Sequence, residues 1–310
     1  FLRGNLNYIL DTAPYDHELE KYHFLRRPMI AQRLNLPTET IRVLYANLEI
    51  NAHPENRAYR YDFLFDNCST RILDQLNRAL SESELDSLEY SQSTATATFR
   101  EHLQPYISDT PWLRLGVNLG LGLPADEVAT TEQESFLPIL LMRILDSAST
   151  ASGPLVARKD TVVVIPEYEQ PSNAFDLPQI LLWLVLIVGC VITVVSFRTG
   201  TPGTSTRVLD TLLFAVVGFV GLVLTLLWFA TQHEVTGPNL NVLWAWPTHL
   251  FVAWWLRAKK APRWLILYLS ATAATCGLVL IGWLFWPQPL PTPLLPLVIL
   301  LVIRATARLK

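Results

Sequence analysis

The residues best suited to chemistry in this sequence surround one cysteine, Cys68, in the stretch YDFLFDNCSTRILDQLNRAL over residues 61–80. The chain has three cysteines, and the other two, Cys190 and Cys276, fall inside long apolar stretches suited to a membrane. A cysteine with no partner outside the membrane is either a small buried hydrophobic residue or a thiol kept free for reaction. Counting cysteines leaves both interpretations open.

The neighbours of Cys68 favour the reactive thiol. Asp66 or Asn67 can cap a helix over residues 68–80, which would place Cys68 in its first turn. Unpaired backbone N–H groups and the positive end of the helix dipole stabilise a thiolate there, and the thiolate is the nucleophile. We expect Asp66 to serve as the cap, while Arg71, one turn later, either adds positive potential or faces water.

The composition indicates a membrane protein in two parts. Hydrophobic residues make up 51% of the chain, charged residues only 16%, and the mean hydropathy is +0.28. Residues 1–170 carry fifteen Lys and Arg and twenty-four Asp and Glu, whereas residues 171–310 are mostly apolar. We therefore predict a globular domain over 1–170, a linker over 171–176 and a membrane domain over 177–310. The acidity of the first domain argues against nucleic acid as a partner.

Five apolar stretches in the second part are predicted to be transmembrane helices, which need about 17 to 25 residues. They cover residues 177–197, 208–230, 240–256, 264–286 and 294–307. The third and fifth are short and flanked by proline, and Pro247 is expected to kink the third. Nine Lys and Arg lie on one side of these spans, while the loops over 231–239 and 287–293 have none. This asymmetry predicts that residues 1–170 lie outside the cytoplasm and the C-terminus inside.

Local patterns in the first part predict the elements that must position the cysteine. Apolar residues at helical spacing indicate helices over 39–52, 68–80 and 135–148, and residues 161–165 have the composition of a strand. The domain is therefore expected to be α+β and mostly helical.

The stretch YDFLFDNCSTRILDQL around Cys68 resembles the signature of the Lnb-type family. The resemblance extends to FLRGNLNYIL at 1–10, TFREHLQPYISDTPWLRLGVNLGLGLPADE at 98–127, ESFLPILL at 134–141 and HEVTGPNLNVLWAWP at 233–247. It implies a periplasmic domain with a papain-like or NlpC-like thiol fold, followed by a multi-spanning, all-α membrane domain. The chain would be placed in the bacterial inner membrane.

The resemblance also implies a histidine base. In the family this histidine belongs to a Gly-His motif upstream of the segment with which this chain begins, so we expect it before Phe1. A thiol needs a base or a cationic neighbour for full activity. The other histidines of the first part, His17, His23, His53 and His102, are weaker candidates, because surface or hydrogen-bonding roles are commoner.

The activity implied by the resemblance is N-acylation of lipoproteins. In this hypothesis Cys68 takes a fatty acyl group from a phospholipid as a thioester, and the amine of a lipoprotein's terminal cysteine accepts it. The Asn-Cys pair is also similar to lecithin–retinol acyltransferases, which hold an acyl group on cysteine. The partners are a phospholipid donor, a lipoprotein acceptor and the membrane. No metal or other cofactor is expected, since no His/Cys spacing suggests one.

The loop between the second and third spans supplies a possible substrate site at the membrane surface. His233, Asn239 and Asn241 lie there, on the same predicted side as Cys68. A capped turn explains these residues equally well. His249, inside the third span, is expected to pack or to form hydrogen bonds.

Two other functions stay open. A cysteine peptidase or amidase acting on cell-wall peptides uses the same Cys/His pair but gains little from five spans. A non-catalytic membrane scaffold would need Cys68 only as a structural residue. Transport is disfavoured, because the predicted spans have no charged residues deep inside them apart from Asp210, near the inner edge, and His249.

Overall fold

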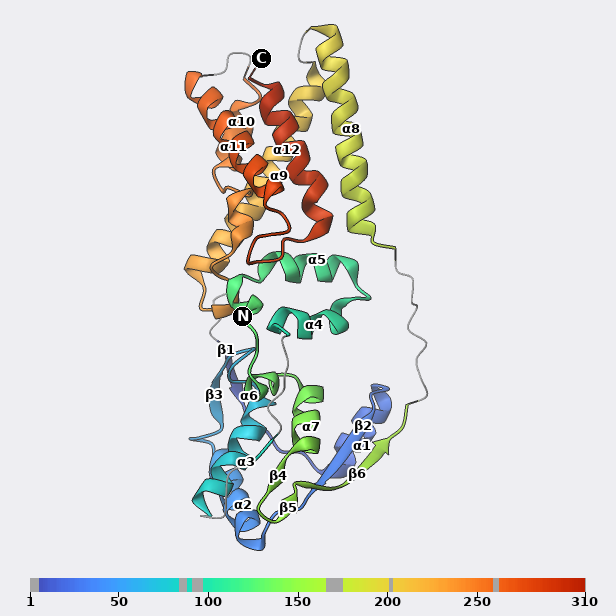
Figure 1. Ribbon diagram of the computed structural model, residues 1–310, viewed down its shortest axis with the longest axis vertical. Helices are drawn as coiled ribbons and strands as arrows, with labels where there is room; N and C mark the ends of the chain where they lie inside the picture. The colour runs from blue at the N-terminus through green and yellow to red at the C-terminus, as the bar shows by residue number, and fades with distance from the viewer. Residues whose placement is uncertain are drawn as a thin grey trace. The chain divides into compact units, whose positions relative to one another are not determined.

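The computed structural model describes residues 6–83, 88–90, 97–165, 175–200, 203–258 and 262–309. The chain divides into two compact units (Figure 1). The first holds the described residues up to Phe99 and from Val128 to residue 165, and the second holds Arg100–Glu127 with the described residues from 175 onward. This differs from the predicted domain over 1–170, because residues 100–127 pack with the membrane helices. The predicted linker over 171–176 lies largely outside the described residues.

The strands of the first unit form small antiparallel sheets. β1 (Leu6–Ile9) pairs with β3 (Ala58–Tyr61), and β2 (Met29–Leu34) pairs with β6 (Val156–Val163). A short hairpin joins β4 (Ser149–Thr150) to β5 (Gly153–Pro154). The strand predicted over 161–165 overlaps only the end of β6, at residues 161–163. Sheet β1–β3 matters most for the site, because the chain passes from β3 directly into the cysteine loop.

The helices of the first unit supply its core. They are α1 (Tyr15–Phe24), α2 (Thr38–Ala52), α3 (Thr70–Glu82), α6 (Thr131–Glu134) and α7 (Pro138–Ser147). The buried leucines of α3 pack with those of α7 and with Leu155 in one apolar cluster. The predicted helix over 39–52 is confirmed as α2. The one predicted over 135–148 is shorter, since Pro138 begins α7 at the position where its missing N–H costs nothing.

The second unit contains the membrane helices. Among the described residues, three helices are long and apolar enough to cross a membrane: α8 (Leu177–Thr199), α9 (Thr204–Ala230) and α11 (Arg263–Ile281). α12 (Leu295–Ala307) follows the turn η4 (Thr292–Leu294). Its 13 residues extend about 20 Å, less than the roughly 30 Å of a bilayer core. On length, three of the five predicted spanning helices are confirmed, and the fifth stretch stays a prediction.

The third predicted span is not a continuous helix. Residues 240–256 form a 3-10 turn, η3 (Leu240–Leu243), then an irregular stretch, and then the short helix α10 (His249–Trp255). This segment runs antiparallel to α9: a Cβ added at Gly218 would lie 2.3 Å from the Leu250 nitrogen, and one added at Gly221 would lie 1.9 Å from the Ala245 oxygen. Glycine thus lets irregular backbone pack closely on α9, where protein rather than lipid surrounds it. Pro247 breaks the helix here rather than kinking it.

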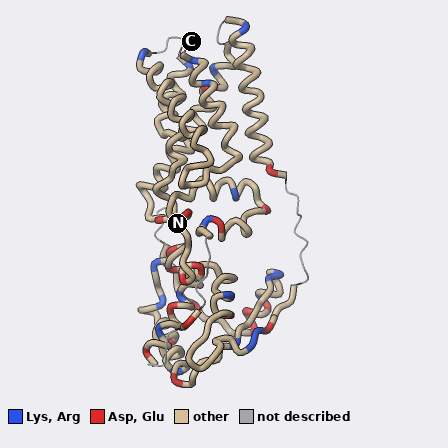
Figure 2. The backbone as a smooth tube through the Cα atoms, viewed as in Figure 1, with Lys and Arg blue, Asp and Glu red and all other residues tan. Residues whose placement is uncertain are grey.

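The remaining elements of the second unit are short, and its charge is uneven. They are α4 (Phe99–Ile107), α5 (Pro111–Gly120), η1 (Leu123–Asp126) and η2 (Glu234–Thr236). Figure 2 shows Lys and Arg gathered at the end of the unit where the C-terminus lies. Inside this end, Arg304 donates to both oxygens of the buried Asp210 at 2.6 and 3.1 Å, and Arg308 bonds the same carboxylate. The buried aspartate is thus fully paired.

Candidate active site

Cys68 lies exposed in the turn that leads into α3. The helix begins at Thr70, two residues later than Cys68 and not at residue 68 as predicted. Helical hydrogen bonding nevertheless starts earlier, because the Arg71 N–H donates to the Asn67 carbonyl at 3.1 Å. Cys68 therefore sits between the capping residue and the first assigned helical residue, at the positive end of the α3 dipole.

The residue that caps α3 is Asn67. Its Oδ1 accepts from the backbone N–H groups of Ser69 at 2.7 Å and Thr70 at 3.1 Å, and Thr70 Oγ1 accepts from the Asn67 N–H at 2.9 Å. Its Nδ2 donates to the carbonyls of Phe63 at 2.8 Å and Phe136 at 2.9 Å. Both ends of the amide are used, and the residue is 3% exposed. This reciprocal cap fixes the backbone on which Cys68 stands.

Asp66 does not cap the helix, so that prediction is wrong. Its carboxylate binds Arg71 in a bidentate pair, with Nε at 2.6 Å and Nη2 at 2.9 Å. The hydrogen bond to Asp66 raises the pKa of Arg71. The Arg71 guanidinium also lies over the Tyr59 ring, 3.7 Å from its centroid. Arg71 is 41% exposed but is not a lone charge, because a carboxylate and an aromatic face hold it.

Tyrosines of sheet β1–β3 lie beside Cys68. Tyr8 stands opposite Tyr59 in the register and stacks on Tyr61, with ring centroids 4.2 Å apart. Burial raises the pKa of Tyr61 to about 12, and the second cause is the negative charge of a Cys68 thiolate. Burial also raises the pKa of Tyr59, again with the Cys68 thiolate as second cause. The phenols next to the sulfur are therefore neutral hydroxyl groups at neutral pH.

The cysteine loop also presents apolar surface. Phe63 and Phe65 flank the loop and are 45% and 41% exposed. Each meets a buried ring edge-on, Phe63 against Phe136 at 6.2 Å and Phe65 against Phe99 at 5.6 Å between centroids. The loop that carries the thiol thus also carries rings that are anchored on one side and exposed on the other.

No described histidine forms a hydrogen bond with the Cys68 sulfur. His17 and His23 lie on α1, and His102 belongs to the other unit. His53 directly follows α2, and its Nδ1 lies 3.7 Å from Oε1 of Glu55. Among the residues that the structure describes, no group of three His, Cys, Asp or Glu side chains could hold a metal ion.

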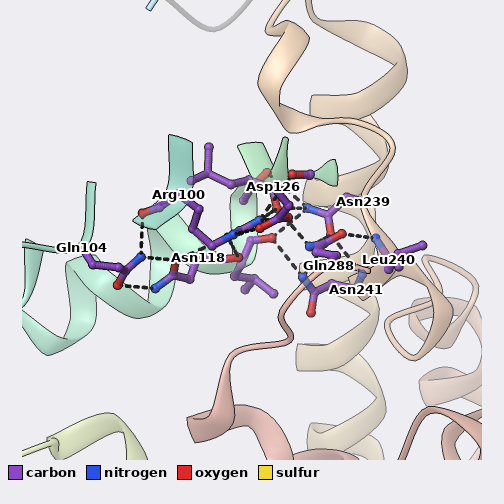
Figure 3. Close-up of polar contacts among 12 residues, drawn as sticks. Arg100, Gln104, Asn118, Asp126, Asn239, Leu240, Asn241 and Gln288 are labelled. Carbon is purple, nitrogen blue, oxygen red and sulfur yellow. Dashed lines mark hydrogen bonds and ion pairs between the residues drawn. The ribbon is translucent and has the colours of Figure 1, made fainter. Parts of the chain in front are cut away.

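The polar residues predicted at the membrane surface form a buried network in the second unit (Figure 3). Asn239 Nδ2 donates to the Leu119 carbonyl at 2.9 Å, while its Oδ1 accepts from the Asn241 N–H at 3.0 Å and from Gln288 Nε2 at 3.2 Å. Asn239 and Asn241 are 2% and 0% exposed. These contacts match a capped turn rather than a surface open to substrate. His233 stands directly before η2 and is only partly buried.

Sequence reasoning missed the part of this network that holds residues 100–127. Arg100 binds Asp126 through Nε at 2.7 Å and Nη2 at 2.9 Å, and both side chains are 6% exposed. Gln288 Nε2 donates to the Leu121 carbonyl at 3.0 Å. A Cβ added at Gly122 would lie 2.4 Å from the Pro238 oxygen. The segment is thus tied to the membrane helices, and only the separate residues, not their pairing, were visible in the sequence.

An exposed thiol on a capped helix start, in a chain that also carries membrane-length helices, defines a membrane protein with a thiol-bearing domain outside the bilayer. Residues 1–104 match the Lnb N-terminal periplasmic domain, and residues 170–310 match the Lnb transmembrane domain. The chain belongs to the Lnb family. It is therefore a membrane protein with an extracytoplasmic segment. No curated protein and no solved structure matched the chain.

Proposed function

We propose that this protein is a thiol-dependent acyltransferase of the bacterial inner membrane. It moves a fatty acyl group from a glycerol ester of the membrane, through a thioester on Cys68, to the N-terminus of a lipoprotein. The observation that carries the proposal is the geometry of Cys68, an exposed thiol that Asn67 holds at the start of α3. Family membership supports it, because the periplasmic and transmembrane parts both match.

The first half of the reaction makes the thioester. The Cys68 thiolate attacks the ester carbonyl carbon, a C–S bond forms, and the C–O bond to glycerol breaks. The leaving alkoxide takes the proton that the thiol gave to its base, and the family resemblance implies a histidine as that base. The papain-like or NlpC-like fold that the family resemblance implies uses a cysteine sulfur in the same role.

The second half transfers the acyl group to nitrogen. The free amine of the lipoprotein's terminal cysteine attacks the thioester carbonyl, a C–N bond forms, and the C–S bond breaks. The amine's proton passes to the base, and the thiolate is restored. An amide is more stable than a thioester, so the step runs forward without an energy source from outside.

Membrane helices and exposed rings suit such a substrate. Removing an acyl chain from the bilayer costs about 0.8 kcal/mol per methylene, so a soluble enzyme would have to repay several kcal/mol. Phe63 and Phe65, in the same loop as the thiol, offer apolar contact to the part of the acyl chain that leaves the bilayer. The donor on this reasoning is any glycerol ester in the same leaflet, whether a phospholipid or the acceptor's own diacylglyceryl group.

A transfer assay on the full-length protein tests the proposal and separates these donors. Purified protein in detergent receives a lipopeptide with a free N-terminal amine, with the labelled acyl chain placed either on a phospholipid or on the lipopeptide. We expect the label to appear as an amide, and Cys68→Ala to abolish the product. Cys190→Ala, in α8, is the matched control and should retain activity. Equal activity in Cys68→Ala, or release of cell-wall peptide fragments without amide formation, would overturn the proposal.

A further inference from the structure

Arginines of the second unit fall into two groups. Arg100, Arg114, Arg304 and Arg308 each bind an aspartate, through Asp126, Asp176 and Asp210. The others make no ion pair among the described residues, and they are Arg198, Arg207, Arg257 and Arg263. An arginine at the end of a membrane helix without a carboxylate partner usually extends toward water, lipid phosphate or a ligand.

Two of these free arginines line the same cavity. It has a volume of about 230 Å³ and lies between the first turns of α9 and the residues just after α10. Its lining residues are Thr204, Arg207, Val208, Thr211, Leu212 and Arg257. α9 and α10 pack on one another, so the two guanidinium groups approach the cavity from separate elements.

The described residues that line the cavity include hydrogen-bond donors and no acidic side chain. Thr211 Oγ1 is buried and has no hydrogen-bond partner among the described residues. α9 begins at Thr204 without a side-chain cap, so its unpaired N–H groups add positive potential at the same end. Asp210 is the nearest acidic residue on α9, and Arg304 and Arg308 already occupy its carboxylate.

We propose that this cavity binds the phosphate headgroup of an anionic phospholipid, with Arg207 and Arg257 as its ligands. Guanidinium groups bind phosphate oxygens in bidentate pairs, and basic pockets between membrane helices suit anionic headgroups. A lipid fits better than free phosphate, because Val208 and Leu212 are 50% and 59% exposed on the same face of α9. They would lie along the acyl chains once the phosphate is in place. The site is separate from Cys68 and does not depend on the proposed acyl transfer.

Native mass spectrometry of the full-length protein tests this site. The protein is transferred into phosphatidylcholine micelles and titrated with phosphatidylglycerol. We expect one phosphatidylglycerol to bind preferentially, and the double variant Arg207→Gln/Arg257→Gln to weaken that binding by about tenfold or more. The matched control is Arg198→Gln/Arg263→Gln, which removes two free arginines that do not line the cavity and should leave the preference unchanged.

Three results would overturn the proposal. The wild-type protein could show no preference for phosphatidylglycerol, or the control pair could weaken binding as much as the cavity pair, which would mean general charge attraction. Displacement of the lipid by millimolar inorganic phosphate would show that the site takes free phosphate instead. If the Arg207→Gln/Arg257→Gln variant keeps its thermal stability in phosphatidylcholine, the weaker binding reflects loss of the site and not loss of the fold. If that variant unfolds, the Arg207→Lys/Arg257→Lys variant replaces it and should bind phosphatidylglycerol with intermediate affinity.

Discussion

At the residue scale, the position of Cys68 depends on the side chain of Asn67. The sequence narrowed the cap to Asp66 or Asn67, because both types cap helices well. It did not show which one, since the choice depends on Phe136, far along the chain, whose carbonyl accepts from Asn67 Nδ2. With Asn67 committed to the cap, Asp66 is free to bind Arg71.

Asn67→Ala is expected to destabilise the first unit by about 2 to 3 kcal/mol, because the buried carbonyls and N–H groups around the amide lose their partners. Chemical denaturation of the full-length protein in detergent measures this. Asn77→Ala, on the same helix and without a side-chain hydrogen bond among the described residues, should change stability by less than about 0.5 kcal/mol. Equal denaturation midpoints for Asn67→Ala and Asn77→Ala would show that Asn67 does not anchor the cysteine loop.

The tyrosine next to the sulfur gives a prediction about pH. Tyr61 keeps its proton in the folded state up to a pKa of about 12, against an ordinary value of 10.0. Its contribution to stability is therefore complete below about pH 10 and is lost as the pH rises toward 12. In Cys68→Ala the pKa of Tyr61 should fall, because one of the negative charges that raise it is gone. Tyrosinate absorbance after a rapid pH jump, with Tyr61→Phe as the reference, measures the pKa of Tyr61 in the wild-type protein and in Cys68→Ala. An unchanged pKa in Cys68→Ala would place the sulfur away from the phenol.

At the element scale, sequence patterns predicted helices well where packing is local and poorly where it is not. The periodic segment 39–52 became α2, and the long apolar stretches became α8, α9 and α11. Hydropathy reports how apolar a stretch is and not whether its backbone stays helical, so residues 240–256 looked like a fourth such helix. The break is possible because Gly218 and Gly221 bring α9 against the irregular backbone.

Gly221→Ala should destabilise the membrane unit markedly. The added methyl group would lie 1.9 Å from the Ala245 oxygen, a backbone atom that cannot move without shifting the segment. Gly277→Ala is the control on α11, where an added Cβ has nothing within 4 Å. Because alanine favours a helix more than glycine does, this control should be neutral or slightly stabilising. Thermal unfolding in detergent measures both, and a Gly221→Ala melting temperature equal to that of the control would contradict the close packing.

At the scale of the whole molecule, the division into a polar half and an apolar half was readable from composition, but its boundary was not. Residues 100–127 have the mixed polarity of a globular domain, yet they belong to the membrane unit. The contacts that hold them span long stretches of sequence, such as Gln288 to Leu121, and one chain read alone contains no signal for such pairs.

The orientation predicted from loop charge is tested by labelling single cysteines in intact cells, in a Cys68→Ser background. Gln232→Cys, in the loop without positive charge, should react with a thiol reagent that does not cross the inner membrane. Gly203→Cys, where an added Cβ has nothing within 4 Å, should react only after that membrane is permeabilised. The reverse pattern would place the Cys68 unit in the cytoplasm.

The central claim, that Cys68 carries the acyl group, is tested most directly by the intact mass of the full-length protein after incubation with a lipid donor and no acceptor. A thioester intermediate accumulates when its second substrate is withheld. We expect a mass increase of one acyl chain that neutral hydroxylamine removes, that a lipopeptide amine discharges, and that is missing in Cys68→Ala. A protein whose mass stays unchanged while amide product still forms when acceptor is added, or an adduct that persists in Cys68→Ala, would contradict the thioester and the role of Cys68 with it.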